Sequence, residues 1–128
     1  MSSAARDVTQ IPSHYKLAVW QDAVDLVCRV YRLTAKLPRH ERFGLIEQIH
    51  RSAVSIPSNI AEGAGRGKGK DAVRFLKIAR GSLMELDTQL ILCRKLGFLD
   101  ETQLPRHSVR KIYAQLNGLI KYRESARA

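Results

Sequence analysis

Hydrophobic residues recur three and four positions apart in four separate stretches of this chain, which is the period of an α-helix with one apolar face. The first face, which Pro38 interrupts, consists of Trp20, Ala23, Val27, Val30, Thr34 and Leu37, and it is widened by Leu17, Val19, Leu26 and Leu33. The second consists of Ile46, Ile49, Ala53, Ile56, Ile60 and Gly63. The third and fourth consist of Leu76, Ala79, Leu83, Leu86, Leu90, Cys93 and Gly97, and of Val109, Ile112, Leu116 and Leu119.

No stretch shows the alternation of a β-strand, so the sequence predicts an all-α protein. Short connections between successive helices favour an antiparallel, up-down-up-down four-helix bundle. With 128 residues the chain is long enough to bury one hydrophobic core. We therefore expect a single bundle domain over residues 17–128, preceded by a poorly ordered extension over residues 1–16.

The third stretch also carries apolar residues away from its main face, where an isolated bundle would meet water. These residues are Ile78, Met84, Ile91 and Leu92. Scattered apolar residues are normal on a protein surface, but this set accompanies the unusually wide apolar face of the first stretch. We interpret it as an interface between copies of the chain and predict a homo-oligomer.

A polar edge runs beside the apolar face of the second stretch, and the third stretch carries polar residues that could meet it. We predict that they form a hydrogen-bond network that fixes the register of the two helices. Its members are Arg51, Ser55, Asn59, Glu62, Ser82 and Glu85, with Ser52 and Gln89 on the same two edges. Pro57 lacks an N–H group and should kink the second helix.

The segment GAGRGKGK joins the second stretch to the third at residues 63–70. Its glycine spacing matches neither GxGxxG nor a Walker loop, and no strand precedes it, which excludes those nucleotide-binding motifs. We expect Gly63 and Gly65 to end the helix, and Gly67 and Gly69 to form a flexible turn.

Positive charge gathers on and after this turn, and the whole chain is basic. The sequence holds 22 lysines and arginines against 12 acidic residues, a formal net charge of +10, which favours attraction to polyanions. We predict phosphate contacts to RNA or DNA, without base readout, at Arg66, Lys68, Lys70, Arg74 and Lys77. The alternative is a solvated linker whose charge serves only solubility.

Catalytic and metal-binding patterns are weak. Glu47 and His50 form an ExxH motif, but a di-iron bundle needs a second such motif and two further glutamates. Glu62 and Glu85 could form a pair of catalytic carboxylates, although Arg51 or Arg80 could equally neutralise them. We therefore expect no metal, no cofactor and no enzymatic activity, with a carboxylate-dependent enzyme as a remote alternative.

The two cysteines, Cys28 and Cys93, lie inside apolar helical patterns and form no CxxC motif. We expect buried free thiols in a reducing compartment. The N-terminal segment MSSAARDVTQIPSHYK lacks the apolar core of a signal peptide, and no apolar run is long enough to span a membrane. These features predict a cytoplasmic protein with no membrane partner.

Three segments resemble a known family: LAVWQDAVDLVCRVYRLTAKLP, FGLIEQIHRSAVSIPSNIAEGAGR and RFLKIARGSLMELDTQLILCRKLGFL. They are similar to the four-helix-bundle family of the 23S rRNA intervening-sequence protein, a fold group that includes the accessory variability determinant of diversity-generating retroelements. The resemblance extends over residues 17–99 and rests on the signatures SIxxNIAEG and GSxxE. The matching positions are Trp20, Arg51, Ser55, Ile56, Asn59, Ile60, Ala61, Glu62, Gly63, Phe75, Ala79, Gly81, Ser82 and Glu85.

The resemblance implies a bundle that assembles into a closed ring, typically a pentamer. It also implies nucleic-acid binding and a reverse-transcriptase partner if the chain follows the accessory branch, whereas many members are encoded away from any retroelement. The leading hypothesis is a non-enzymatic, ring-forming nucleic-acid-binding protein. The alternative is a structural or protein-binding oligomeric module with no nucleic-acid role.

Overall fold

The structure is a computed structural model of the chain, and it describes residues 10–67 and 69–126. These residues form four α-helices and no β-strand, which confirms the all-α prediction. The helices are α1 (Ala18–Thr34), α2 (Glu47–Gly65), α3 (Lys70–Lys95) and α4 (Arg106–Ala126).

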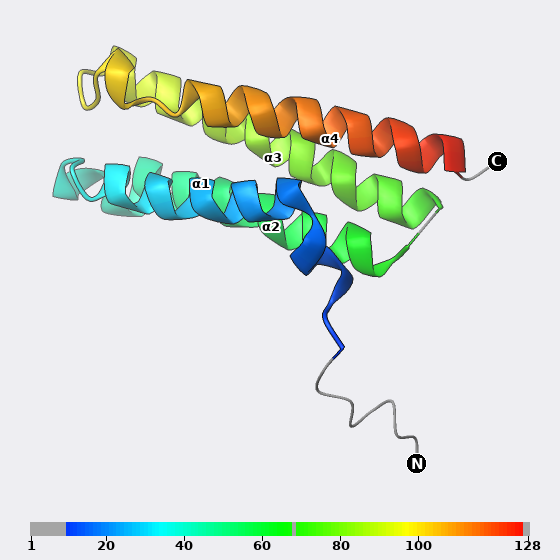
Figure 1. Cartoon of the computed structure of the whole chain (residues 1–128). Coiled ribbons are helices and arrows are strands. Elements are labelled where there is room, and N and C mark those ends of the chain that lie inside the picture. The colour runs from blue at the N-terminus through cyan, green and yellow to red at the C-terminus, as the bar shows by residue number, and fades with distance from the viewer. Residues whose placement is uncertain (1–9, 68, 127–128) are drawn as a thin grey trace.

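The four helices lie side by side along a common direction, and the chain turns back at each connection (Figure 1). α1 packs against α2 and α4, and α3 packs against the same two helices, so the bundle closes on itself. The α1–α2 and α3–α4 connections lie at one end of the bundle (Figure 1). The α2–α3 turn and the end of α4 lie at the other.

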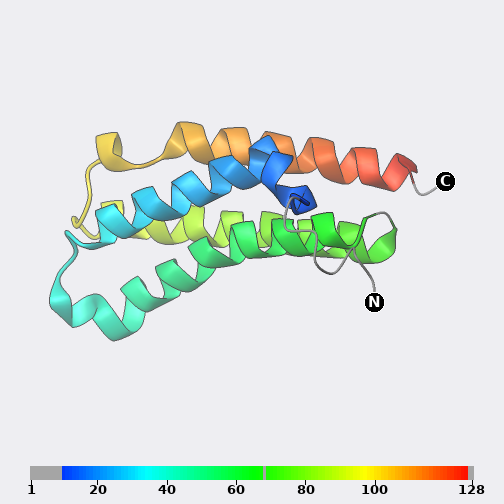
Figure 2. The ribbon, with the colours of Figure 1, turned by 60° about the horizontal axis from the view of Figure 1, so that its bottom comes forward.

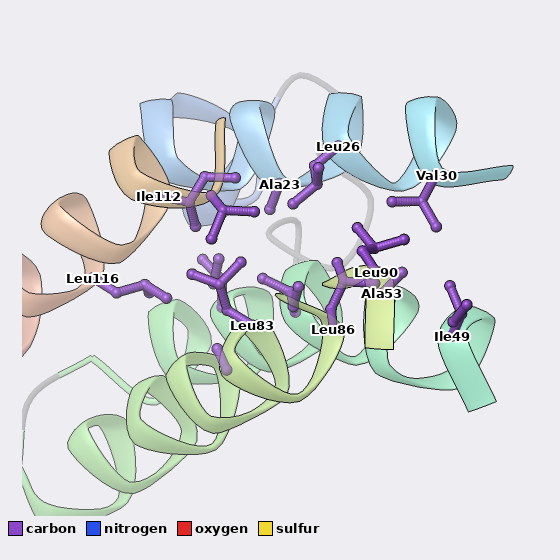
Figure 3. Close-up of a cluster of buried hydrophobic side chains, with 14 of the residues drawn as sticks. Ala23, Leu26, Val30, Ile49, Ala53, Leu83, Leu86, Leu90, Ile112 and Leu116 are labelled. Atoms are coloured by element: carbon purple, nitrogen blue, oxygen red, sulfur yellow. The ribbon is translucent and has the colours of Figure 1, made fainter. Parts of the chain in front are cut away.

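The predicted apolar faces of the helices meet in one hydrophobic core. Figure 3 shows Leu26 of α1 and Leu83 of α3 among the side chains that fill the space between the helices, with Ile112 of α4 nearby. Burying a leucine or isoleucine side chain contributes about 1.5–3 kcal/mol, so this core accounts for most of the favourable free energy of folding. Among the predicted positions, five are only partly buried: Leu17, Trp20, Val27, Ile46 and Leu119. Gly97 is exposed in the turn after α3.

The cysteines differ from each other. Cys93 is fully buried in the core, and its burial, together with the charge of Glu41, raises the pKa of its thiol. Cys28 is exposed, so the prediction of a buried thiol is wrong for this residue. It lies on the side of α1 opposite Ala23 and Leu26, because each residue advances the helix by about 100°.

The connection from α1 to α2 is built from two short helical elements. After the break at Pro38, η3 (Arg39–Glu41) is a 3-10 helix and η4 (Arg42–Ile46) is a π-helix that runs directly into α2. α2 itself continues through Pro57, and Figure 2 shows that it bends along its length. The connection from α3 to α4 contains the short 3-10 helix η5 (Glu101–Gln103).

The N-terminal extension is described from residue 10 onward, and residues 1–9 lie outside the described part of the chain. η2 (Ser13–Lys16) is a 3-10 helix that packs against α2, and the Ser13 hydroxyl donates a long hydrogen bond of 3.4 Å to the Ala64 carbonyl. The Tyr15 ring stacks on Trp20 with centroids 5.5 Å apart. These contacts connect residues 13–16 to α2 and to the beginning of α1.

Candidate functional site

A chain of hydrogen bonds joins α2 to α3 at the predicted polar edge. The hydroxyl oxygens of Ser55 and Ser82 lie 2.7 Å apart. The Asn59 side-chain amide donates to the Ser55 carbonyl at 2.8 Å and to the Ser55 hydroxyl at 2.9 Å. One turn earlier, the Ser52 hydroxyl donates to the Glu85 carboxylate at 3.1 Å. Ser52, which the sequence placed on the same polar edge, belongs to these contacts.

Two predicted members of the network have other partners. Arg51 pairs with Glu47 at 3.4 Å, and Glu62 lies 3.8 Å from Arg66. Both side chains are largely exposed, since Arg51 and Glu62 project from a part of α2 that faces away from the core. Their inclusion in the inter-helix network is therefore wrong. Arg80, which could have neutralised either glutamate, instead donates to Asn117 of α4 at 2.8 Å.

Gly63 has a different role from the one predicted. It is buried inside α2, and a Cβ at this position would lie 3.1 Å from the Ala72 carbonyl oxygen and 3.2 Å from the Leu76 side chain. α2 continues to Gly65, so Gly63 does not end the helix. Its missing side chain lets the beginning of α3 approach α2 closely.

A polar cleft of about 300 Å³ lies between α2 and α3 next to the Ser52–Glu85 contact. Its walls include Gln48, Arg51 and Gln89. The Gln89 side-chain oxygen is buried and has no hydrogen-bond partner among the described residues.

The predicted basic turn gathers its cations around Phe75. The guanidinium carbons of Arg66 and Arg74 lie 5.2 and 4.5 Å from the centroid of that ring. Each cation also has an acidic neighbour, because Arg66 lies near Glu62 and Arg74 lies 3.7 Å from Asp71. These pairs are exposed, and exposed pairs contribute only about 0–1 kcal/mol.

Lys70 and Lys77 extend the same positive surface along α3. Lys77 lies 3.4 Å from Glu124 of α4, whereas no ion pair within the described part of the chain includes Lys70. Lys68 lies outside the described residues.

The turn itself is held by α4. Gly67 and Gly69 have φ angles of 75° and 99°, so they require the left-handed backbone that glycine tolerates. The guanidinium of Arg123 donates a hydrogen bond to the Gly67 carbonyl. The sequence held no signal for this contact, because only the folded bundle brings the end of α4 beside the turn.

The predicted interface residues on α3 are mostly at the surface. Ile78, Met84 and Leu92 are exposed by 40%, 37% and 45%, and Ile91 is half-buried. Gly81 lies between them, and a Cβ at this position would meet no atom within 4 Å. This side of α3 thus exposes apolar residues around Gly81, with the exposed polar residues Glu85 and Thr88 among them.

The two residues of the ExxH motif, Glu47 and His50, contact different partners. Glu47 pairs with Arg51, while the His50 ring nitrogen lies 2.7 Å from the Thr34 hydroxyl. Among the residues that the structure describes, no three histidine, cysteine or acidic residues form a group that could hold a metal ion. No described helix combines the length and apolar character needed to cross a membrane.

Comparison with protein families identifies the chain. The model of the 23S rRNA-intervening sequence protein family matches residues 15–121. The chain belongs to this family. The match covers the polar edge, the basic turn and the exposed face of α3, and it confirms the family to which the SIxxNIAEG and GSxxE signatures pointed. No curated protein matches the sequence.

Proposed function

We propose that this member of the 23S rRNA-intervening sequence protein family binds nucleic acid through phosphate contacts and is not an enzyme. The observation that carries the proposal is the basic surface at the α2–α3 turn, where Arg66, Lys70, Arg74 and Lys77 gather on neighbouring turns of helix. The name of the family refers to ribosomal RNA, which supports RNA as a ligand.

The ion pairs of this surface do not prevent phosphate binding. The acidic partners Glu62, Asp71 and Glu124 have side chains exposed by 56%, 63% and 43%, so each pair is accessible to water and salt. A polyanion offers several phosphates at once, and the cations can exchange one weak exposed partner for another. Contacts of this kind carry no base information, so binding should be independent of sequence.

Self-association is the second part of the proposal. Ile78, Met84 and Leu92 would be covered if α3 packed against another copy of the chain, and such a contact would remove apolar surface from water. A closed ring, with a pentamer as its expected form, would repeat the basic turn on every subunit and raise the avidity for a long strand. A reverse transcriptase or an RNA-processing protein is the class of protein partner that this function would serve.

A second candidate function is a structural or protein-binding module. The exposed apolar residues of α3 favour it, because apolar side chains are covered by contact with another protein and do not bind phosphate. In this case the positive charge would serve solubility only. A carboxylate-dependent enzyme is not proposed, because Glu62 lies beside Arg66 and Glu85 accepts a hydrogen bond from Ser52.

Filter binding across a salt series separates these functions. The full-length protein would be mixed with single-stranded RNA, single-stranded DNA and duplex DNA of several unrelated sequences. The proposal predicts similar affinity for all sequences of one type, with log K falling linearly as log salt rises. Absence of binding at low salt, with the oligomer intact, would leave the structural module as the function.

A further inference from the structure

A pocket of about 390 Å³ lies where the end of α1 meets the beginning of α2. Figure 2 shows that this connection is at the end of the bundle opposite the α2–α3 turn. It is lined by residues of α1, of the short helices η3 and η4, and of α2. The lining residues that matter here are Tyr31, Thr34, Arg39, Arg42, Ile46 and His50. Its volume is near the lower end of the range of about 300–1,000 Å³ for small-molecule sites.

One wall of the pocket is a pair of stacked rings. The imidazole of His50 stacks on the phenol ring of Tyr31, with centroids 3.8 Å apart and an interplanar angle of 10°. The Thr34 hydroxyl donates to the Tyr31 carbonyl at 3.2 Å, so its oxygen is left to accept from His50 Nε2, 2.7 Å away. In this arrangement the Nδ1 atom of a neutral His50 is an acceptor.

Arg39 and Arg42 supply positive charge to the same pocket. Neither arginine takes part in an ion pair among the described residues, and no acidic side chain lines the pocket. The nearest acids along the chain are used elsewhere, since Glu41 lies 3.4 Å from His40 and Glu47 lies 3.4 Å from Arg51. The pocket therefore combines two guanidinium groups with an aromatic wall and the apolar side chain of Ile46.

We propose that this pocket binds a single phosphorylated nucleotide, with the phosphate at Arg39 and Arg42 and the base near the Tyr31–His50 pair. Arginine is suited to phosphate because its fork of N–H donors matches the phosphate oxygens. Aromatic side chains bind bases by stacking, and the Tyr31 side chain is accessible at 44% exposure. The nucleotide is either free or the terminal nucleotide of a strand, since both present the same chemistry.

The first experiment titrates the full-length protein with the four nucleoside monophosphates by calorimetry. Unphosphorylated nucleosides and inorganic phosphate are titrated in parallel. Because both halves of the ligand contribute, a monophosphate should bind at least about tenfold more tightly than either half, as expected for added hydrogen bonds to charged groups. Equal affinity for monophosphates and inorganic phosphate, or no binding at all, would overturn the proposal.

Variants then test the two halves of the pocket. The double variant Arg39→Gln/Arg42→Gln should lose at least about tenfold in affinity for the monophosphates. Tyr31→Leu should reduce monophosphate affinity toward that of inorganic phosphate. The matched control is Arg32→Gln/Arg110→Gln, which removes the same charge from exposed positions outside the pocket and should leave affinity unchanged. If the control loses as much affinity as the pocket variant, the loss is explained by the change in net charge alone, and the proposal is overturned.

Strands with different ends distinguish the two sources of the ligand. One RNA sequence is compared with a 5′-phosphate, a 3′-phosphate or hydroxyl groups at both ends. A preference for one phosphorylated end that Arg39→Gln/Arg42→Gln abolishes assigns the pocket to strand termini. Equal binding of all three strands, together with tight monophosphate binding, assigns it to a free nucleotide. The hydroxyl-ended strand reports on the basic turn alone, so failure of this proposal is distinguishable from failure of the proposed function.

Discussion

The hydroxyl group of Ser55 on α2 lies 2.7 Å from that of Ser82 on α3, and this contact connects two helices across their interface. Ser82 is buried, and Asn59 donates to the same Ser55 hydroxyl from one turn further along α2. Each hydroxyl has a single proton to donate. The hydrogen bonds of Ser55, Ser82 and Asn59 therefore depend on one another. The contact therefore ties the axial position of α2 to that of α3.

Replacement of Asn59 tests this dependence. Asn59→Leu removes the donor to the Ser55 carbonyl and hydroxyl and should lower the free energy of unfolding by about 1–3 kcal/mol. Chemical denaturation measures the change. The control is Ser58→Ala, which removes an exposed bond to the Val54 carbonyl within the same helix and should change stability by less than about 0.5 kcal/mol. An unchanged stability and mass for Asn59→Leu would instead indicate that Asn59 serves a binding role.

Two glycines of α2 should respond in opposite ways to the same substitution. Gly63→Ala forces a methyl group against the Ala72 carbonyl and the Leu76 side chain, and should cost about 1–3 kcal/mol. Gly65→Ala places a methyl group in open space and should be neutral or stabilising by up to about 1 kcal/mol. Thermal melting of the two variants compares them directly. Equal melting temperatures would contradict the close approach of α3 at Gly63.

Removing the cations of the basic turn should lower the affinity for nucleic acid by about the same factor for every base sequence. A variant with all five cations replaced by glutamine should keep its fold and mass and bind all strands more weakly. The replaced residues are Arg66, Lys68, Lys70, Arg74 and Lys77. Each lost contact should flatten the slope of log K against log salt by about 0.9 on duplex DNA and about 0.7 on single strands.

A second variant with the same change in net charge serves as the control for the basic turn. It replaces five exposed cations that lie outside the turn and the nucleotide pocket: Arg32, Lys36, Lys95, Arg110 and Lys111. The control should retain most of the affinity and slope of the natural protein. If the turn variant binds as tightly as the control, the turn is a linker and phosphate binding lies elsewhere.

Self-association predicts a mass above that of one chain. Light scattering at micromolar protein should give a multiple of 14.5 kDa, and Ile78→Asp/Leu92→Asp should reduce the mass to that of the monomer by placing charge on the exposed face of α3. Tyr113→Asp is the control, because Tyr113 is similarly exposed, at 40%, but lies on α4. A natural protein of 14.5 kDa in solution would exclude the homo-oligomer at that concentration.

The stability of the protein should depend on His50 at mildly acidic pH. Burial lowers the pKa of His50, so the unfolded chain takes up a proton near the ordinary histidine pKa of about 6.5 while the folded chain does not. The free energy of unfolding should therefore fall as the pH drops below that value toward the folded pKa. Chemical denaturation at a series of pH values measures this slope. His50→Gln should have a smaller slope, with the other histidines unchanged, and an identical slope would contradict the lowered pKa.

The helices of this protein could be located from local information. The three-and-four spacing of Leu83, Leu86 and Leu90 places those residues in the core whatever the other helices do, because an apolar face has to be covered. Pro38 and the glycines near residue 67 likewise end helices for reasons that lie within a few bonds of each residue. The number of helices and most core positions followed from such features.

The partners of polar residues depended on the tertiary structure. Spacing placed Arg51 and Glu62 near the polar edge of α2, but in the bundle each pairs with a residue one turn away, Glu47 or Arg66, and not with a residue of α3. Gly63 looks like a helix end in sequence, and only the position of Ala72 on the facing helix gives it another role. The pocket beside His50 and the bond from Arg123 to Gly67 likewise join residues far apart in the chain. A helical pattern specifies which face a residue occupies, whereas its partner depends on how neighbouring helices are rotated and shifted, and that is decided by packing across the whole core.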